Sequence, residues 1–183
     1  MPSSSGMRQP DGLDVAERRA ASDAQGGAES ADSLDDNPRY QVHAFHSEIL
    51  PDDRAVMVYV PVEYGQQDER RFPVLYLNDG QNLFDGRTSH VAGKTWHVHE
   101  TADRLVRDGV IEPVILVGIA NTGLRRMAEY TPTRDDTMGG GEGRNYGRLL
   151  VEELKPWIDR SYRTRAGAES TGLGGSSLGG LVS

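Results

Sequence analysis

The chain has 183 residues, no cysteine, a formal net charge of −8 and a sequence pI of about 5.1. This length suits one domain plus a tail. The acidic balance argues against binding to nucleic acid or to an anionic membrane, since both need basic patches. The absence of cysteine excludes disulfides, thiolate metal sites and a cysteine nucleophile. No apolar run approaches the roughly 20 residues that span a bilayer.

Residues 1–37 are predicted to form a disordered acidic tail. They contain no aromatic residue and carry −5 of the net charge, from three basic and eight acidic side chains. Such a segment cannot bury enough apolar surface to offset the entropy of ordering it. The alternative is a short helix over residues 13–21 that docks on a partner. No apolar stretch follows Arg18 and Arg19, as a signal peptide requires, so we expect a cytoplasmic protein.

From residue 38 onward, strand patterns alternate with helix patterns. Strands are expected over residues 40–46, 56–60, 72–77, 113–120 and 170–174, and helices over residues 96–107 and 145–162. The runs 72–77 and 113–120 are continuously apolar, which is typical of strands covered on both faces. The alternation predicts an α/β fold over residues 38–183, with a mostly parallel sheet and helices on both faces.

Three residues bear on the predicted helices. Thr95 is a candidate N-cap for the first helix, and Gly109 marks its end. The apolar residues of the second helix fall near one face at helical spacing: Leu149, Leu150, Leu154, Trp157, Ile158 and Tyr162. Pro156 lies within this helix and has no backbone N–H. We therefore expect it to kink the helix or to remove one backbone hydrogen bond.

Residues 175–179, Gly-Ser-Ser-Leu-Gly, match the G-x-S-x-G pattern of a nucleophile elbow, with Ser177 at the centre. In an elbow the serine lies on a sharp strand-to-helix turn that exposes its hydroxyl, and flanking glycines avoid clashes. The backbone N–H of Leu178 is then an oxyanion donor. The alternative is a glycine-rich loop or phosphate cradle, although no lysine completes a G-x-x-x-x-G-K pattern. The position after a predicted strand favours the elbow.

A second oxyanion donor is expected in the loop that follows the strand 72–77. The candidate is the backbone N–H of Gln81, because Gly80 allows the backbone to approach a substrate closely. The alternative is an ordinary Asn-Asp-Gly turn. Asp79 in this loop is interpreted as a turn-stabilising residue rather than as a catalytic acid.

Four blocks of sequence resemble the putative esterase family of α/β hydrolases, and they occur in the family's order. The blocks are 74–84 (VLYLNDGQNLF), 121–132 (NTGLRRMAEYTP), 154–159 (LKPWID) with 162–164 (YRT), and 175–180 (GSSLGG). The family includes enterochelin-type esterases, S-formylglutathione hydrolases, feruloyl and acetylxylan esterases, and mycolyltransferases. The resemblance implies the N-terminal part of an α/β-hydrolase fold, with its last strands and helices missing.

The resemblance also implies a function. Ser177 is expected to be the nucleophile of a serine esterase that acts on a small-molecule ester or thioester through an acyl-enzyme. The N–H groups of Leu178 and Gln81 are expected to form the oxyanion hole. No cofactor, metal, nucleic acid or membrane is expected. Acyl transfer to an alcohol and a non-catalytic hydrolase-like binding module are the alternatives.

The family's triad runs in the order Ser, acid, His, but neither an acid nor a histidine follows Ser177. All five histidines precede it: His43, His46, His90, His97 and His99. We therefore expect a C-terminally truncated chain that is inactive on its own. His97 and His99 follow the oxyanion loop, yet we interpret them as polar residues at a helix start, because a general base also needs hydrogen-bond reach. With Glu100 they do not have convincing metal-ligand spacing.

Two further segments are interpreted as structural. Residues 138–143 are glycine-rich and are expected to form a flexible loop, with a wall of the substrate cleft as the alternative. Arg125, Arg126 and Glu129 are expected to form ion pairs that hold their loop, with binding of a polar substrate group as the alternative.

Overall fold

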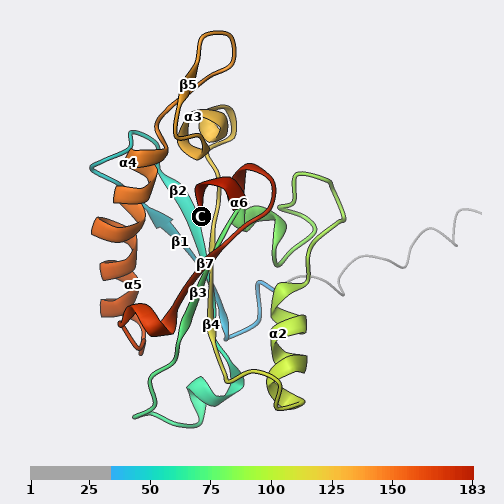
Figure 1. Ribbon diagram of the computed structural model, residues 1–183. Helices are drawn as coiled ribbons and strands as arrows, with labels where there is room; N and C mark the ends of the chain where they lie inside the picture. The colour runs from blue at the N-terminus through green and yellow to red at the C-terminus, as the bar shows by residue number, and fades with distance from the viewer. Residues whose placement is uncertain (1–33) are drawn as a thin grey trace, which may run out of the picture. The chain divides into compact units, whose positions relative to one another are not determined.

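The computed structural model describes residues 34–183, which form one unit around a five-stranded sheet (Figure 1). The strands lie in the order β1-β2-β4-β3-β7. Their bounds are Tyr40–Phe45 (β1), Arg54–Tyr59 (β2), Val74–Asn78 (β3), Ile115–Ile119 (β4) and Thr171–Gly174 (β7). The pairs β1–β2 and β2–β4 are antiparallel, whereas β3 runs parallel to both β4 and β7. Because β3 and β7 are parallel, the loops that follow them leave the same edge of the sheet.

The apolar runs of the sequence become the inner strands, as predicted. Every residue of β4 is buried, and β4 pairs with β2 on one side and with β3 on the other. A strand with a neighbour on each side and helices above and below needs apolar side chains on both faces. The prediction of a parallel sheet is confirmed for β4, β3 and β7, and the N-terminal hairpin adds an antiparallel part.

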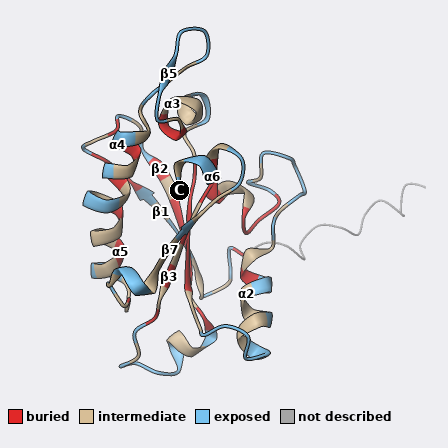
Figure 2. Cartoon of the chain, in the orientation of Figure 1, coloured by how far each residue is buried: buried red, intermediate tan, exposed pale blue. Residues whose placement is uncertain are grey.

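Helices cover both faces of the sheet, as predicted. The helix α2 (Val98–Arg107) lies on one face, and a long helical segment, residues 143–161, lies on the other (Figure 1). Figure 2 shows the buried residues on the strands and on the helix surfaces that face them. Under the long segment the core includes Val58, Val117, Leu149, Leu154 and Ile158, and under α2 it includes Tyr59, Leu83, Phe84 and Leu116.

Pro156 is accommodated by a π-helical turn in the long helical segment. The segment consists of α4 (Gly143–Arg148), the π-helical η5 (Leu149–Leu154) and α5 (Lys155–Ser161). The N–H of Lys155 bonds to the carbonyl oxygen of Leu150, five residues back. Proline has no N–H and its ring clashes with the carbonyl group four residues earlier in a regular helix. The predicted disturbance is therefore present, and it takes the form of a wider turn.

The start of α2 differs from the prediction. The N-cap is His97, with φ 50° and ψ 41°, and the helix begins at Val98. Thr95 is not the cap, because it precedes the first helical residue by three positions; its hydroxyl oxygen accepts the N–H of His97 at 3.5 Å, and its hydroxyl donates to the carbonyl oxygen of Asn82 at 3.1 Å. The hydroxyl thus closes the loop that precedes the helix. Gly109 follows the helix end with φ 69°, as expected of a helix terminator.

The remaining elements are short. They are η2 (Val62–Gly65), η3 (Gly80–Asn82), η4 (Gly123–Arg125), α3 (Arg126–Tyr130), β5 (Arg134–Asp135), β6 (Gly139–Gly140), η6 (Ala168–Ser170) and α6 (Leu178–Val182). The glycine-rich segment 138–143 contributes β6 to a two-residue hairpin with β5. The turn is held by the Asp135 carboxylate, which accepts the N–H groups of Thr137 and Met138, both at 2.8 Å.

Most of the predicted tail, residues 1–33, lies outside the described residues. The described part begins at Leu34, which is buried and packs in the same core as Tyr59 and Phe84. Within residues 34–183, no helix has the length and apolar character needed to cross a bilayer. The expected cytoplasmic location stays a prediction.

Candidate active site

Ser177 lies at the sharp turn that joins β7 to α6. Its backbone has φ 56° and ψ −125°. A residue other than glycine rarely adopts such a conformation, which costs about 1–3 kcal/mol and persists only where surrounding contacts hold it. Ser177 is exposed, and its hydroxyl has no hydrogen-bond partner within residues 34–183. The turn therefore presents a free hydroxyl on a strained backbone.

Gly175 and Gly179 allow the backbone to double back at this turn. A Cβ atom on Gly175 would lie 2.5 Å from the carbonyl carbon of Gly179, closer than real Cβ atoms come to other atoms. A Cβ atom on Gly179 would lie 3.0 Å from Oδ2 of Asp79. Glycine is required at both positions because neighbouring atoms approach closely, and not because φ is positive.

The loop that follows β3 has an equally tight turn. Asp79 has φ 60° and ψ 45°, in the left-handed region, and its carbonyl oxygen accepts the N–H of Asn82 at 2.9 Å. Gly80 packs directly on β4, since a Cβ atom there would lie 2.5 Å from the carbonyl carbon of Gly118. This turn is the setting of Gln81, whose N–H is the predicted second donor.

Asn78 joins the two turns. This residue ends β3 and is buried. Its side-chain amide donates to the carbonyl oxygen of Gly179 at 2.9 Å and to the hydroxyl of Ser183 at 3.0 Å, and it accepts the hydroxyl of Tyr146 at 2.6 Å. Burial raises the pKa of Tyr146 well above its ordinary value, so the phenol stays protonated and can donate. Asn78 thus holds α6 against the end of β3, beside the loop of Gln81.

Neither predicted oxyanion donor has a hydrogen-bond partner among the residues that the structure describes. The N–H groups of Gln81 and Leu178 donate to no acceptor within residues 34–183. Both residues are half-buried, so each unpaired N–H is open to an acceptor from outside the chain, such as the oxygen of a ligand.

A strap, defined as residues 121–130, covers the loop of Gln81. Arg126 in the strap donates two hydrogen bonds of 2.7 Å to the carboxylate of Asp79. Asn121 adds a third hydrogen bond of 2.7 Å to the same carboxylate, and its own backbone N–H donates to the side chain of Gln81 at 3.2 Å. The hydrogen bond with Asp79 raises the pKa of Arg126 above its ordinary value. Asp79 thus stabilises the turn, in agreement with its interpretation from the sequence.

Three more ion pairs fix the strap to its surroundings. Arg125 pairs with Asp52 at 3.0 Å and with Glu142 at 2.5 Å near the surface. Glu129 accepts two hydrogen bonds from Arg54, at 3.1 and 3.2 Å, and both side chains are fully buried. The predicted network of ion pairs that holds this loop is confirmed.

A cavity of about 660 Å³ opens beside the predicted second donor. It is lined by residues of the β3 loop, of the segment before α2 and of the strap: Asp79, Gln81, Asn82, Thr88, His90, Asn121, Gly123, Leu124 and Arg126. Segment 138–143 does not contribute to this lining, and neither does Ser177. The cavity therefore borders Gln81 and not Ser177.

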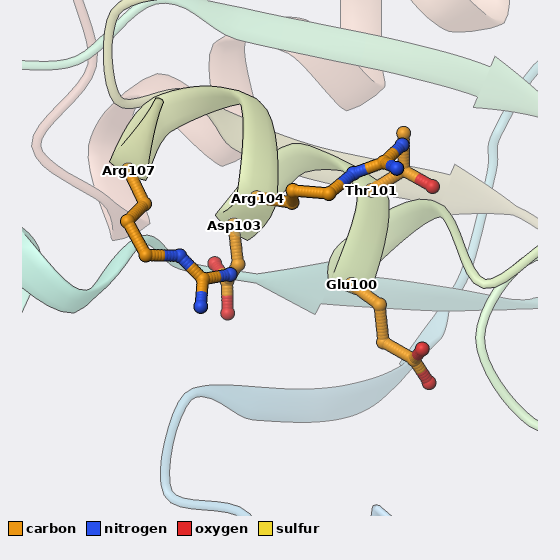
Figure 3. A pocket seen from close by; sticks show the side chains of 5 residues that line it. All are labelled: Glu100, Thr101, Asp103, Arg104 and Arg107. Atoms are coloured by element: carbon orange, nitrogen blue, oxygen red, sulfur yellow. The ribbon is translucent and has the colours of Figure 1, made fainter. Parts of the chain in front are cut away.

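Another cavity, of about 550 Å³, lies on α2 (Figure 3). All its lining residues belong to that helix: Glu100, Thr101, Asp103, Arg104 and Arg107. Asp103 is engaged, because it accepts hydrogen bonds from Arg39 at 2.7 and 3.1 Å and from Tyr59 at 2.9 Å. This cavity includes no residue of the β3 loop or of the β7–α6 turn.

None of the five histidines is hydrogen-bonded to Ser177. Three of them are hydrogen-bonded to another polar side chain: His43 to Tyr162, His46 to Asp53, and His97 to Glu100. His97 lies at the start of α2, as predicted, but His99 is not a polar surface residue. It is buried against the rings of Tyr59 and Phe84, and this burial lowers its pKa. His90 lines the cavity beside Gln81.

A sheet with helices on both faces, and a strained, glycine-framed serine between a strand and a helix, define the α/β-hydrolase fold. A family model described as a putative esterase matches residues 47–183. The chain belongs to this family.

Known proteins agree with this assignment. An endo-1,4-beta-xylanase/feruloyl esterase of Xylanibacter ruminicola is 32% identical over 144 residues, which cover 75% of this chain and 18% of that protein. The uncharacterized protein YbbA of Bacillus subtilis is 27% identical over 143 residues, which cover 75% of this chain and 52% of that protein. An IroE-like serine hydrolase from Shewanella oneidensis, known from its crystal structure, has 29% sequence identity and a TM-score of 0.63. The match covers 78% of this chain and 44% of that protein's chain. The chain thus spans about half the length of these relatives, or less.

Proposed function

We propose that this chain carries the nucleophile and both oxyanion donors of a serine esterase. The observation that carries the proposal is the strained backbone of Ser177, with an unpaired hydroxyl, on the turn between β7 and α6. The loop of Gln81 is tied to that turn through Asn78. Strain at a single exposed serine, held by tight packing on both sides, is what presentation of a nucleophile requires.

In the proposed reaction, Ser177 Oγ attacks the carbonyl carbon of an ester or thioester. The N–H groups of Leu178 and Gln81 stabilise the negative oxygen of the tetrahedral intermediate, and each such donor contributes roughly 3 kcal/mol. The intermediate expels an alcohol or a thiol, which takes up the proton given by the Ser177 hydroxyl, and leaves an acyl-enzyme, which water hydrolyses. If an alcohol replaces water in the last step, the reaction is acyl transfer.

The names of the relatives support this chemistry. The protein from Xylanibacter ruminicola is named a feruloyl esterase, and the one from Shewanella oneidensis is named a serine hydrolase. A small-molecule ester or thioester is therefore the proposed substrate class.

A fluorophosphonate probe tests the proposal, because it modifies only activated serines. The probe is applied to the full product of the gene. We expect modification of Ser177, identified by mass spectrometry, and loss of labelling in Ser177→Ala. The neighbouring Ser176→Ala is the matched control and should label normally.

Two outcomes contradict the proposal. Labelling that persists in Ser177→Ala would assign the reactive serine elsewhere. A folded full product that takes up no probe would favour the alternative of a non-catalytic, hydrolase-like binding module.

A further inference from the structure

Asp79 is a buried carboxylate that borders both proposed oxyanion donors. It precedes Gln81 by two residues, and its Oδ2 packs against Gly179, the residue after Leu178. The backbone of Asp79 is left-handed, and its carbonyl oxygen closes the turn from which the Gln81 N–H projects. The position of this one residue therefore affects the direction of a donor and the charge around it.

Arg126 neutralises the carboxylate of Asp79 with a fork of two hydrogen bonds. Nε donates to Oδ1 and Nη2 donates to Oδ2, both at 2.7 Å. Such bidentate pairs fix geometry as well as charge. The guanidinium itself lies over the ring of Tyr130, 5.1 Å from its centre, and its hydrogen bond with Asp79 raises its pKa. Arg126 is therefore held in place by both neighbours.

An unpaired carboxylate at this position would oppose catalysis. The tetrahedral intermediate carries negative charge on the former carbonyl oxygen, and like charges repel strongly in a partly buried site. The same carboxylate would also lose two of the three hydrogen bonds that hold its side chain in the left-handed turn. Both consequences would weaken the oxyanion hole.

We propose that Arg126 is a positioning residue that acts through Asp79: it cancels the charge of the carboxylate and fixes the turn that aims the Gln81 N–H. This inference rests on the proposed esterase activity. Arg126 lines the cavity beside Gln81, but its Nε and Nη2 both donate to Asp79, and the proposed role acts through that carboxylate rather than through direct binding of the substrate.

The test measures hydrolysis of p-nitrophenyl acetate by variants of the full gene product. In Arg126→Gln the carboxylate keeps only its contact with Asn121. We expect kcat to fall about 100-fold, the order lost with one oxyanion donor, while KM changes by no more than about twofold. Asp79→Asn removes the negative charge and leaves a cation, which does not repel the oxyanion, so its kcat should fall far less.

The double variant, Asp79→Asn with Arg126→Gln, separates a charge effect from a structural one. Because it contains no unpaired carboxylate, we expect its kcat to exceed that of Arg126→Gln by about tenfold. A merely structural role predicts the reverse, since the double variant lacks more contacts. Arg126→Lys keeps a cation beside Asp79, so its kcat should exceed that of Arg126→Gln. If Arg126→Gln does not fold, Arg126→Lys takes its place in the test.

Arg125→Gln is the matched control. It removes a neighbouring arginine of the strap that pairs with Asp52 and Glu142 and does not contact Asp79. We expect its kcat to equal that of the wild type. The proposal is overturned if Arg126→Gln and Arg126→Lys keep the wild-type kcat, or if the double variant is no faster than Arg126→Gln. Activity that survives Ser177→Ala would instead overturn the proposed function and leave the role of Arg126 aside.

Discussion

Gly175 and Gly147 are both glycines outside the positive-φ region, but their surroundings differ. A Cβ atom on Gly175 would meet the backbone of Gly179 at 2.5 Å, whereas one on Gly147, within α4, would meet no atom within 4 Å. The same added methyl group is therefore a severe clash at the turn of Ser177 and is harmless on the helix.

This contrast predicts opposite effects of the same substitution. Gly175→Ala should lower the free energy of unfolding by about 1–3 kcal/mol, because backbone atoms must move to admit the methyl group. Gly147→Ala should raise it by about 0.5–1 kcal/mol, since alanine loses less entropy in a helix. Urea denaturation followed by circular dichroism measures both. A Gly175→Ala variant as stable as the wild type would contradict the packing described for the turn.

Local pattern was sufficient to predict Ser177, Leu178 and Gln81 as candidates, because the elbow motif and the loop after β3 have short signatures. The sequence did not indicate the role of Asn78. Its partner Tyr146 is 68 residues away, and its contact with Gly179 spans 101 residues. A polar residue at the end of a buried apolar strand was the one available signal, and it does not identify a partner.

The buried pair of Arg54 and Glu129 links two elements that are distant in sequence. Arg54 begins β2, and Glu129 lies in α3, within the strap. Thr122 also donates to Glu129, at 3.1 Å, and Arg54 lies over the ring of Tyr146. Burial of two charges is costly. The pair is tolerated because the two side chains carry opposite charges and bond to each other.

Breaking this pair should cost much more than removing it. Glu129→Leu leaves the arginine charge buried and unpaired, so we expect a loss of about 3–5 kcal/mol in the free energy of unfolding. The double variant Arg54→Met with Glu129→Leu should recover most of that loss. Glu152→Ala is the control: it breaks the exposed pair of Arg148 and Glu152, which is worth about 0.5 kcal/mol or less.

Urea denaturation of the four proteins checks this prediction. Equal losses in Glu129→Leu and in the double variant would contradict it, because they would indicate lost packing rather than an unpaired charge.

The elements themselves were mostly predictable. Apolar runs and helical spacing identified the strands and the long helical segment, since both signals are local. The start of α2 was predicted two residues too early. Thr95 has the right chemistry for an N-cap, but its hydroxyl is tied to the carbonyl oxygen of Asn82, the helix starts only at Val98, and only the folded chain brings Thr95 and Asn82 together.

For the 183-residue chain as a whole, the surroundings of its five histidines predict poor turnover. None of them contacts Ser177, so the chain by itself is proposed to lack an efficient base. Loss of the base in a serine hydrolase costs of the order of a millionfold in kcat, although an oxyanion hole alone retains about 10³- to 10⁴-fold over water.

We therefore expect the purified 183-residue chain to hydrolyse p-nitrophenyl acetate only slightly faster than its Ser177→Ala variant. Initial rates, corrected for spontaneous hydrolysis, provide the measurement. His90→Ala is included because His90 lines the cavity beside Gln81. Ordinary turnover that both Ser177→Ala and His90→Ala abolish would show that an upstream histidine serves as the base.

The family, the α/β alternation and the candidate nucleophile follow from the residues alone, because each depends on spacing over a few positions. The strand order and the contacts that join the β3 loop, the strap and the β7–α6 turn do not. Arg126 and Asp79 are 47 residues apart in the chain, and many other partners are equally compatible with their sequence positions. Such pairings arise only when packing of the sheet and helices brings distant polar groups into a buried space where each must find a partner.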